Sequence, residues 1–302
     1  MLVDSFGRPL KSLRVTLTQK CNFNCIYCHR EGESKTSEEL KPKEVAILVE
    51  VMVKLGVKRV KLTGGEPLLY DGLVELVEML DGTGVEDLSM VTNGSLLSGF
   101  AGKLRDKGLK RVNISLPSLK PERFRWITKG DLESVLSGIR AAVDVGFDPV
   151  KLNVVVLRGV NDDEVLDYVS FAEKLGVMLQ FIELENVSLP PGFYENYHRS
   201  LDFVEDLLED RIVSVSYREE VNWRKKLLLD SGVEVHLVSP VDNPNFCKYC
   251  YRMRLTSGGF LKPCLMRNDG LVYVRDALEK NDVAEVVKKI LEANKHRRPY
   301  YL

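Results

Sequence analysis

Every cysteine in this sequence belongs to a triplet whose spacing is typical of iron–sulfur ligation. The triplets are Cys21, Cys25 and Cys28, in a C-x3-C-x2-C run, and Cys247, Cys250 and Cys264, in a C-x2-C-x13-C run. A cubane cluster has four irons, so three thiolates leave one iron open. Catalytic metal sites likewise keep one coordination position vacant for substrate. Two such triplets in one chain predict two [4Fe–4S] clusters and chemistry on a bound substrate.

Disulfides and zinc are the alternative uses of these cysteines. An even cysteine count allows disulfides, but disulfide frameworks are typical of short secreted chains. This chain has 302 residues, and residues 1–8 lack the charged and then apolar pattern of a signal segment. Zinc is the stronger rival at the second triplet, because C-x2-C is a common zinc half-site. Zinc would need a fourth ligand, and His236 is the nearest histidine in the sequence.

The amino-acid composition excludes some classes of binding partner. Lys and Arg total 43 and Asp and Glu total 44, so the net charge is −1. That balance lacks the positive excess of nucleic-acid-binding proteins and polybasic membrane anchors, and the apolar runs are far too short to span a membrane. Unpaired, thiol-rich metal sites are typical of a reducing compartment. We therefore expect a cytoplasmic protein that binds neither nucleic acid nor membrane.

Short β-branched segments alternate with helical patterns from Leu13 to about Leu184. The pattern predicts strands at 13–17, 60–63, 88–92, 112–116, 150–157 and 179–182, and helices at 43–55, 73–80, 135–145 and 165–175. Six strand–helix units imply a parallel sheet. Polar residues such as Cys21, Gly64 and Asn93 follow the strands, and barrel enzymes hold their sites at that end. We therefore favour an α/β fold, an incomplete (β/α)6 TIM-like barrel, over an open doubly wound sheet.

The pattern changes after Glu185. It predicts a breaker at 188–192, helices at 201–208 and 283–291, strands at 213–217 and 233–238, and a hairpin turning at 257–259. We divide the chain into a core of residues 1–220 and a C-terminal α+β appendage of residues 221–302. The appendage carries the second triplet and is expected to cap the mouth of the barrel.

The first triplet resembles the signature of the radical S-adenosylmethionine superfamily. Tyr27 precedes the last cysteine, and the segment 63–67, Thr-Gly-Gly-Glu-Pro, follows the second strand, where that superfamily carries a GGE motif. The resemblance implies that the open iron takes the amino and carboxylate groups of S-adenosylmethionine, and that Glu66 accepts hydrogen bonds from the ammonium group. The resemblance assigns cluster binding to Cys21, Cys25 and Cys28, and S-adenosylmethionine binding to Tyr27, Gly65, Glu66 and Ser115.

The segment from Phe246 to Leu265 resembles the C-terminal motif of the GTP 3',8-cyclase family, and the likeness extends over residues 6–265. It implies that Cys247, Cys250 and Cys264 hold an auxiliary cluster whose open iron faces guanine. The same resemblance assigns GTP binding to Arg14, Lys61, Lys151, Arg252, Met253 and Arg254. A triphosphate carries about four negative charges, which several converging cations would compensate.

Several positions depart from that family's pattern. Gln180 stands where relatives often have an arginine, so one phosphate partner is missing. The other departures are Val91 for threonine, Glu185 for methionine, Tyr251 for asparagine, and a C-terminal tail at residues 298–302 without the Gly-Gly found in many relatives.

The resemblance implies a lyase of molybdenum cofactor biosynthesis. Reductive cleavage of S-adenosylmethionine would give a 5'-deoxyadenosyl radical, which would abstract the ribose 3'-hydrogen of GTP so that this carbon attacks guanine C8. Such an enzyme needs an electron donor and passes its product to a cyclic pyranopterin synthase. A radical maturase acting on a peptide is the second enzyme hypothesis. A non-catalytic metal-binding or redox-sensing protein is the third.

Overall fold

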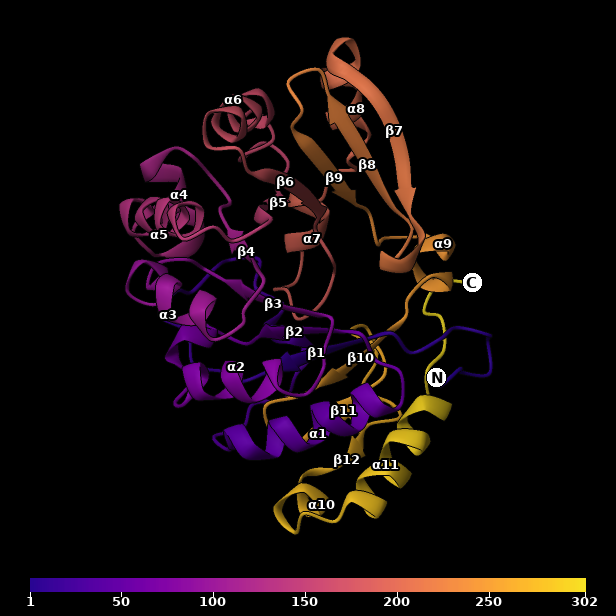
Figure 1. The fold of residues 1–302 in the computed structure, drawn as a ribbon. Helices are drawn as coiled ribbons and strands as arrows, with labels where there is room; N and C mark the ends of the chain where they lie inside the picture. Colours follow the sequence, from indigo (N-terminus) through magenta and orange to yellow (C-terminus); the bar gives the residue numbers. More distant parts are fainter.

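The first half of the chain folds into six strand–helix units around a parallel sheet, as the sequence predicts (Figure 1). The computed structural model describes residues 1–302. The strands of these units are β1 (Ser12–Thr16), β2 (Arg59–Thr63), β3 (Asp87–Thr92), β4 (Arg111–Ser115), β5 (Val150–Val156) and β6 (Met178–Glu183). The helices are α1 (Pro42–Lys54), α2 (Leu73–Asp81), α3 (Ala101–Asp106), α4 (Pro121–Thr128), α5 (Leu132–Asp144) and α6 (Val165–Leu175).

The C-terminal region adds six strands and five short or medium helices. The strands are β7 (Ile212–Arg218), β8 (Arg224–Leu229), β9 (Glu234–Val238), β10 (Arg252–Leu255), β11 (Phe260–Lys262) and β12 (Val272–Tyr273). The helices are α7 (Phe193–Tyr197), α8 (Asp202–Leu208), α9 (Pro244–Lys248), α10 (Arg275–Glu279) and α11 (Val283–Lys295).

All twelve strands form one open sheet, in the order β12-β11-β10-β1-β2-β3-β4-β5-β6-β9-β8-β7. The incomplete barrel is therefore confirmed, but the C-terminal region does more than cap it. β9 pairs in parallel with β6, and β10 pairs in parallel with β1, so the later strands extend the barrel wall at both edges. The expected boundary after residue 220 needs correction, because it falls between β7 and β8, which pair as antiparallel neighbours.

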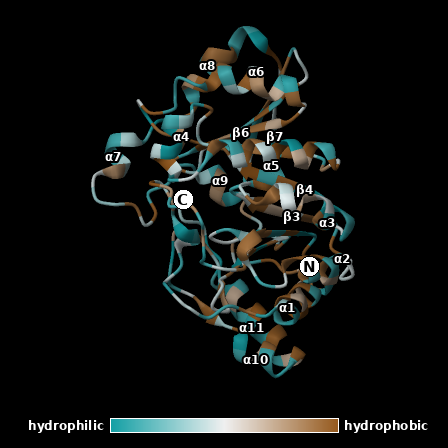
Figure 2. Cartoon of the chain, turned by 90° about the vertical axis from the view of Figure 1, so that its left-hand side faces the viewer, coloured by the Kyte–Doolittle hydropathy of each residue, from teal (hydrophilic) through white to brown (hydrophobic).

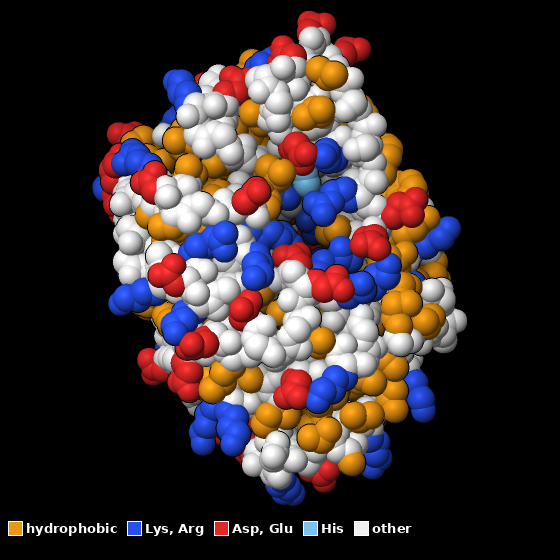
Figure 3. Space-filling model, viewed as in Figure 1, with side chains coloured by type: hydrophobic (Ala, Val, Ile, Leu, Met, Phe, Trp, Pro, Cys, Tyr) orange, Lys and Arg blue, Asp and Glu red, His pale blue; other side chains and the backbone are white.

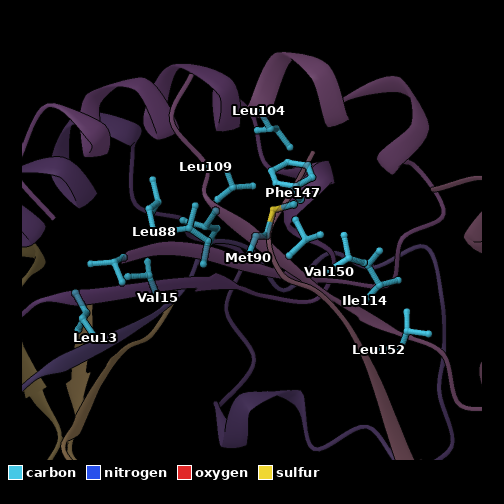
Figure 4. Close-up of a cluster of buried hydrophobic side chains, with 14 of the residues drawn as sticks. Leu13, Val15, Leu88, Met90, Leu104, Leu109, Ile114, Phe147, Val150 and Leu152 are labelled. Carbon is cyan, nitrogen blue, oxygen red and sulfur yellow. The ribbon is translucent and has the colours of Figure 1, made fainter. Parts of the chain in front are cut away.

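Alternation along each barrel strand separates a core face from a polar face. In β1, Leu13 and Val15 are buried, whereas Arg14 lies on the opposite face. Figure 4 shows such strand residues packed beneath the helices, with Leu104 of α3 and Phe147 lying above Met90 of β3. Burying a leucine side chain fully contributes about 1.5–3 kcal/mol. The outer face thus stabilises the barrel and leaves the inner face free for charged residues.

The covering helices begin at recognisable sequence signals. The carboxylate of Asp131 accepts a hydrogen bond from the Ser134 amide at 2.8 Å and caps α5, while Pro42 and Pro121 occupy the first turns of α1 and α4. Figure 2 shows hydrophilic and hydrophobic residues side by side on α1 and α5, as expected for helices with one face on the core. None of the helices is long and apolar enough to cross a lipid bilayer.

Candidate active site at the open end of the barrel

One cavity of about 1310 Å³ occupies the inside of the sheet, and both cysteine triplets line it. Its volume exceeds the roughly 300–1,000 Å³ of an ordinary ligand pocket. Figure 3 shows Lys and Arg side chains gathered around a hollow in the middle of the molecule. The topology thus brings two sequence motifs more than 200 residues apart to a single site. Such a space is large enough for a nucleotide and a second small molecule together.

The first triplet lies on the loop between β1 and α1. The amides of Asn24 and Ile26 donate to carbonyls at the end of α4, at 2.9 and 3.0 Å, which fixes the loop against that helix. Phe23 packs edge-to-face against Phe124, with ring centroids 6.1 Å apart. The three thiols are free, and those of Cys21 and Cys28 are exposed to the cavity.

These three thiols suit a positively charged group. Burial raises the pKa of all three thiols, and the neighbouring Cys28 and Cys21 help to raise the pKa of Cys25 to about 12. A buried set of mutually repelling thiolates becomes stable when a metal group offsets its charge. Thiolates are also the ordinary ligands of iron–sulfur clusters. The donor set therefore fits the [4Fe–4S] cluster predicted for it.

The two glycines after β2 allow the chain to pass close behind this loop. A Cβ on Gly65 would lie 2.2 Å from the Lys20 carbonyl oxygen, and one on Gly64 would lie 2.7 Å from that of Thr18. Both distances are shorter than any side chain tolerates, so glycine is required at both positions. Gly65 also lines the cavity, as do Tyr27 and Ser115, the other expected S-adenosylmethionine contacts.

Glu66 does not reach the cavity, which corrects its expected contact with S-adenosylmethionine. Its side chain is fully buried behind the wall, and its carboxylate accepts hydrogen bonds from the Thr92 hydroxyl at 2.7 Å, the Asn93 amide at 2.7 Å and the Leu68 amide at 3.0 Å. Burial raises the pKa of Glu66, against the effect of those three hydrogen bonds. The residue holds the ends of β2 and β3 together and thereby positions Gly65.

The second triplet lies at α9 and after β11, and two buried arginines clamp its backbone. Arg8 donates to the Cys247 carbonyl and Arg297 to the Cys250 carbonyl, each at 2.9 Å. Asp4 accepts from Arg8 at 2.9 Å and lies 3.6 Å from Arg297. The two ends of the chain therefore hold the second triplet in place.

Within the second triplet, the surroundings of Cys250 favour a thiolate. Burial would raise the pKa of Cys250, but Arg252, Arg8 and Arg297 outweigh it and lower that pKa. Burial raises the pKa of Cys264. The zinc alternative finds no fourth ligand here, because His236 hydrogen-bonds Lys151 at 3.1 Å and does not line the cavity. No set of three Cys, His, Asp or Glu side chains converges around a single metal ion, as a tetrahedral zinc site requires.

The inner face of the sheet carries the expected cations. Arg14, Lys61, Lys151, Arg252 and Arg254 all line the cavity. Met253 does not, because the alternation along β10 turns its side chain into the core, where it is fully buried. Met253 can therefore contribute to the expected GTP contact of the segment 252–254 only through its backbone. Sequence reasoning did not identify four further arginines that line the same cavity, namely Arg30, Arg111, Arg218 and Arg224.

Glu31 is a buried carboxylate that sequence reasoning did not identify. Its oxygens lie 2.5 Å from Arg14 and 2.8 Å from Arg254, and one accepts from Thr63 at 3.1 Å. Burial disfavours its charge, but Arg14, His29 and Arg254 hold its pKa well below the usual range. Its backbone adopts a left-handed conformation with φ of 52°. Glu31 therefore ties the first triplet's loop to β1 and β10.

The other expected cations have only neutral partners. Lys61 donates to Asn113 at 3.0 Å, Arg252 to Asn222 at 3.3 Å, and Lys151 lies 3.1 Å from His236. Burial, assisted by repulsion from neighbouring arginines, lowers the pKa of Lys151 to about 6 and that of Arg252 to about 10. A buried group of cations without carboxylates is suited to a polyanionic ligand.

The positions at which the sequence departs from the family pattern also lie at this cavity. Val91, Gln180, Glu185 and Tyr251 line it, as do Tyr300 and Tyr301 of the C-terminal tail. The Tyr301 amide lies 3.4 Å from the Cys247 sulfur and donates to it. The tail therefore reaches the second triplet without a Gly-Gly ending.

Comparison with known proteins agrees with this geometry. The model of the radical SAM superfamily matches residues 15–172, and the Molybdenum Cofactor Synthesis C model matches residues 177–302. Among solved structures, Streptococcus suis SuiB bound to its precursor peptide SuiA aligns with a TM-score of 0.65 and 15% identity, over 93% of this chain and 67% of that one. Escherichia coli coproporphyrinogen III oxidase aligns with a TM-score of 0.53 and 14% identity, over 90% and 70%. The fold and the first triplet together define a radical S-adenosylmethionine protein.

Relatives of similar length show to which family within this superfamily the chain belongs. The chain is 46% identical over 300 residues to the "Probable GTP 3',8-cyclase" of Methanothermobacter thermautotrophicus, with 99% of this chain and 98% of that protein covered. It is 40% identical over 300 residues to the protein of the same name from Methanocaldococcus jannaschii, with the same coverage. The chain belongs to the GTP 3',8-cyclase family.

Proposed function

We propose that this chain cyclises GTP to (8S)-3',8-cyclo-7,8-dihydroguanosine 5'-triphosphate, using S-adenosylmethionine and a reductant, as an early step of molybdenum cofactor biosynthesis. The observation that carries the proposal is one cavity lined by two cysteine triplets and a set of buried cations. Family membership is in accord with this activity.

We assign a [4Fe–4S] cluster and S-adenosylmethionine to the first triplet, and a second [4Fe–4S] cluster to Cys247, Cys250 and Cys264. When bound, a reduced cluster supplies the electron for cleavage of S-adenosylmethionine. Tyr27, Gly65 and Ser115 would shape the S-adenosylmethionine site beside the first triplet. Free thiols on both triplets and the lowered pKa of Cys250 support these assignments.

The protein's own contribution is to bind and orient the nucleotide. Arg14, Lys61, Lys151, Arg252 and Arg254 would hold the triphosphate, because they line the same cavity as the two triplets. That placement would leave the ribose near the first triplet and the base near the second. Holding two reactants in a reactive geometry accounts for much of an enzyme's rate enhancement. The enclosed site would also exclude water from a reactive radical.

The proposed reaction implies partners outside this chain. One is an electron donor, and another is a cyclic pyranopterin synthase that consumes the product. Free thiols at both triplets favour a reducing, cytoplasmic location. We propose no nucleic-acid or membrane partner, since the net charge is −1 and the cations face inward.

The test is anaerobic incubation of the reconstituted protein with GTP, S-adenosylmethionine and dithionite, followed by mass analysis of the nucleotide. A cyclised product that requires S-adenosylmethionine, together with 5'-deoxyadenosine, supports the proposal. A parallel reaction with ATP tests the choice of base. Cleavage of S-adenosylmethionine with GTP recovered unchanged would refute GTP as the substrate and would redirect attention to a peptide.

A further inference from the structure

A chain of side-chain hydrogen bonds crosses the inner face of the sheet from β2 to β8. Lys61 donates to Asn113 at 3.0 Å, and Asn113 donates to Asn153 at 3.1 Å. Gln180 donates to the same Asn153 oxygen at 2.9 Å, and Arg224 donates to the Gln180 oxygen at 2.9 Å. The amides are therefore fixed in orientation, and a cation with unused donors stands at each end.

Arg224 has no anionic partner. No carboxylate lies within ion-pair distance of it, and its buried Nε atom has no hydrogen-bond acceptor. Arg218 stands directly opposite on β7, so two like charges share one face of the hairpin. Burial and repulsion from Arg252, Arg218 and Arg14 lower the pKa of Arg224 to about 9. The free protein therefore holds an unfavourable arrangement that an anion would relieve.

Other arginines of the cavity are already neutralised. Arg111 pairs with Asp87 through two hydrogen bonds of 2.8 and 2.5 Å, and Arg59 pairs with Glu220 at 3.1 Å. A third carboxylate serves Arg14 and Arg254. Among the cavity cations carried by strands, those without a carboxylate partner are Lys61, Lys151, Arg218, Arg224 and Arg252. The positive charge available to a ligand is thus concentrated on a subset of the cavity wall that includes β8.

We propose that Arg224 binds the phosphates of the nucleotide and that Gln180 positions its guanidinium. This inference rests on the proposed function and adds to it a binding residue from outside the six barrel units. A guanidinium offers donors in a planar fork that matches phosphate oxygens. The hydrogen bond to Gln180 uses one terminal nitrogen and leaves the donors of the other terminal nitrogen for phosphate oxygens. Arg224 thereby supplies, from a different strand, the guanidinium that is missing at position 180.

The test compares R224Q with K225Q in the reconstituted protein. Lys225 is a matched control, because it is the next residue on β8, carries the same charge and pairs with Glu205 at 2.5 Å away from the cavity. Equilibrium binding is measured with GTP, guanosine and inorganic triphosphate. Loss of a charge-assisted hydrogen bond predicts a ten- to roughly hundredfold weaker binding of GTP and inorganic triphosphate to R224Q. Guanosine binding to R224Q, and all binding to K225Q, are expected to stay within about twofold of wild type.

The double variant R224Q/Q180R exchanges the two residues that this hydrogen bond joins, so the guanidinium stands at position 180 and the net charge is unchanged. We expect the double variant to recover most of the lost affinity for inorganic triphosphate. If R224Q alone does not fold, the affinity of the double variant tests whether a guanidinium at this place binds the phosphates. Binding of GTP and inorganic triphosphate to R224Q within about twofold of wild type would overturn the inference, as would a folded double variant that binds neither. The proposed function fails separately, if the wild-type protein forms no cyclised nucleotide.

Discussion

The two cysteine triplets offer the same ligand chemistry, but only the second contains a thiol whose pKa is lowered by neighbouring arginines. Around the first triplet, burial and neighbouring carboxylates and thiols raise the pKa of every thiol. Around the second, Arg8, Arg252 and Arg297 lower the pKa of Cys250. Net charge and hydrogen bonding near a cluster set its reduction potential. The two sites therefore differ because of their positions in the fold and not because of their ligand type.

The first region is built for an electron-rich cluster and the second for an anionic substrate. A cluster beside carboxylates and thiolates is harder to reduce and is a stronger reductant once reduced. A site beside unpaired arginines attracts a polyphosphate. We therefore assign reductive cleavage to the first triplet and binding of the substrate to the second.

The largest effect is expected from replacing Cys21, Cys25 and Cys28 with alanine. The variant should lose both 5'-deoxyadenosine formation and GTP cyclisation, because the reductive site is removed. Its iron content after anaerobic reconstitution should fall to about half of that of wild type, since one of two cubanes is lost. Iron analysis and chromatography of the products measure these outcomes. Persistent 5'-deoxyadenosine formation would contradict the assignment.

Replacing Arg297 with alanine should be the most destabilising change outside the triplets. It leaves the Cys250 carbonyl and Asp4 with fewer partners in a buried place, a kind of loss that costs about 3–5 kcal/mol. Denaturant unfolding measures the change, and iron content should fall selectively at the second triplet. Arg298→Ala, at an exposed ion pair with Asp269, is the control and should cost less than about 1 kcal/mol. Equal effects of the two variants would argue against the clamp.

Replacing Glu66 with glutamine should cost about 1–3 kcal/mol of stability, because an amide group must face one of three backbone or hydroxyl donors. Thermal unfolding and S-adenosylmethionine binding are measured together. We expect the stability loss to dominate, since the side chain lies behind the cavity wall. Unchanged stability with lost S-adenosylmethionine affinity would restore the original assignment of Glu66 to the ammonium group.

Binding of GTP should take up protons at pH 7–8, because burial lowers the pKa of Lys151 to about 6 and that of Lys61 well below its ordinary value, and a bound triphosphate raises both. Affinity should therefore fall as pH rises above about 6. Stability of the free protein has the opposite slope: the unfolded lysine stays protonated up to its normal pKa of 10.5, so stability rises with pH between about 6 and 10.5. Calorimetry in buffers of different ionisation enthalpy measures the uptake, and Lys151→Met should reduce it by about one proton.

Sequence patterns predicted the barrel well and its extension poorly. The β-branched segments located all six barrel strands, because apolar alternation is a local property. The strand β8 was not predicted, since Arg224, Lys225 and Lys226 obscure the alternation. The parallel pairing of β9 with β6 and of β10 with β1 joins distant segments, which no local pattern encodes.

For the site residues too, local motifs predicted one part and contacts between distant segments form the other. The cysteines and glycines carry their chemistry in the motif itself, and the structure brings both triplets to one cavity. Glu31 escaped notice because its partner Arg254 is 223 residues away. The burial of the Met253 side chain was not predicted, because a motif does not show which face of a strand each residue occupies.

Replacing Cys247, Cys250 and Cys264 with alanine tests the division of labour most directly. The measurement quantifies 5'-deoxyadenosine and cyclised nucleotide in the same anaerobic reaction with GTP, S-adenosylmethionine and dithionite. The account predicts that 5'-deoxyadenosine still forms while cyclised nucleotide is absent. Cyclisation at the wild-type level in a variant with half the iron would contradict the account.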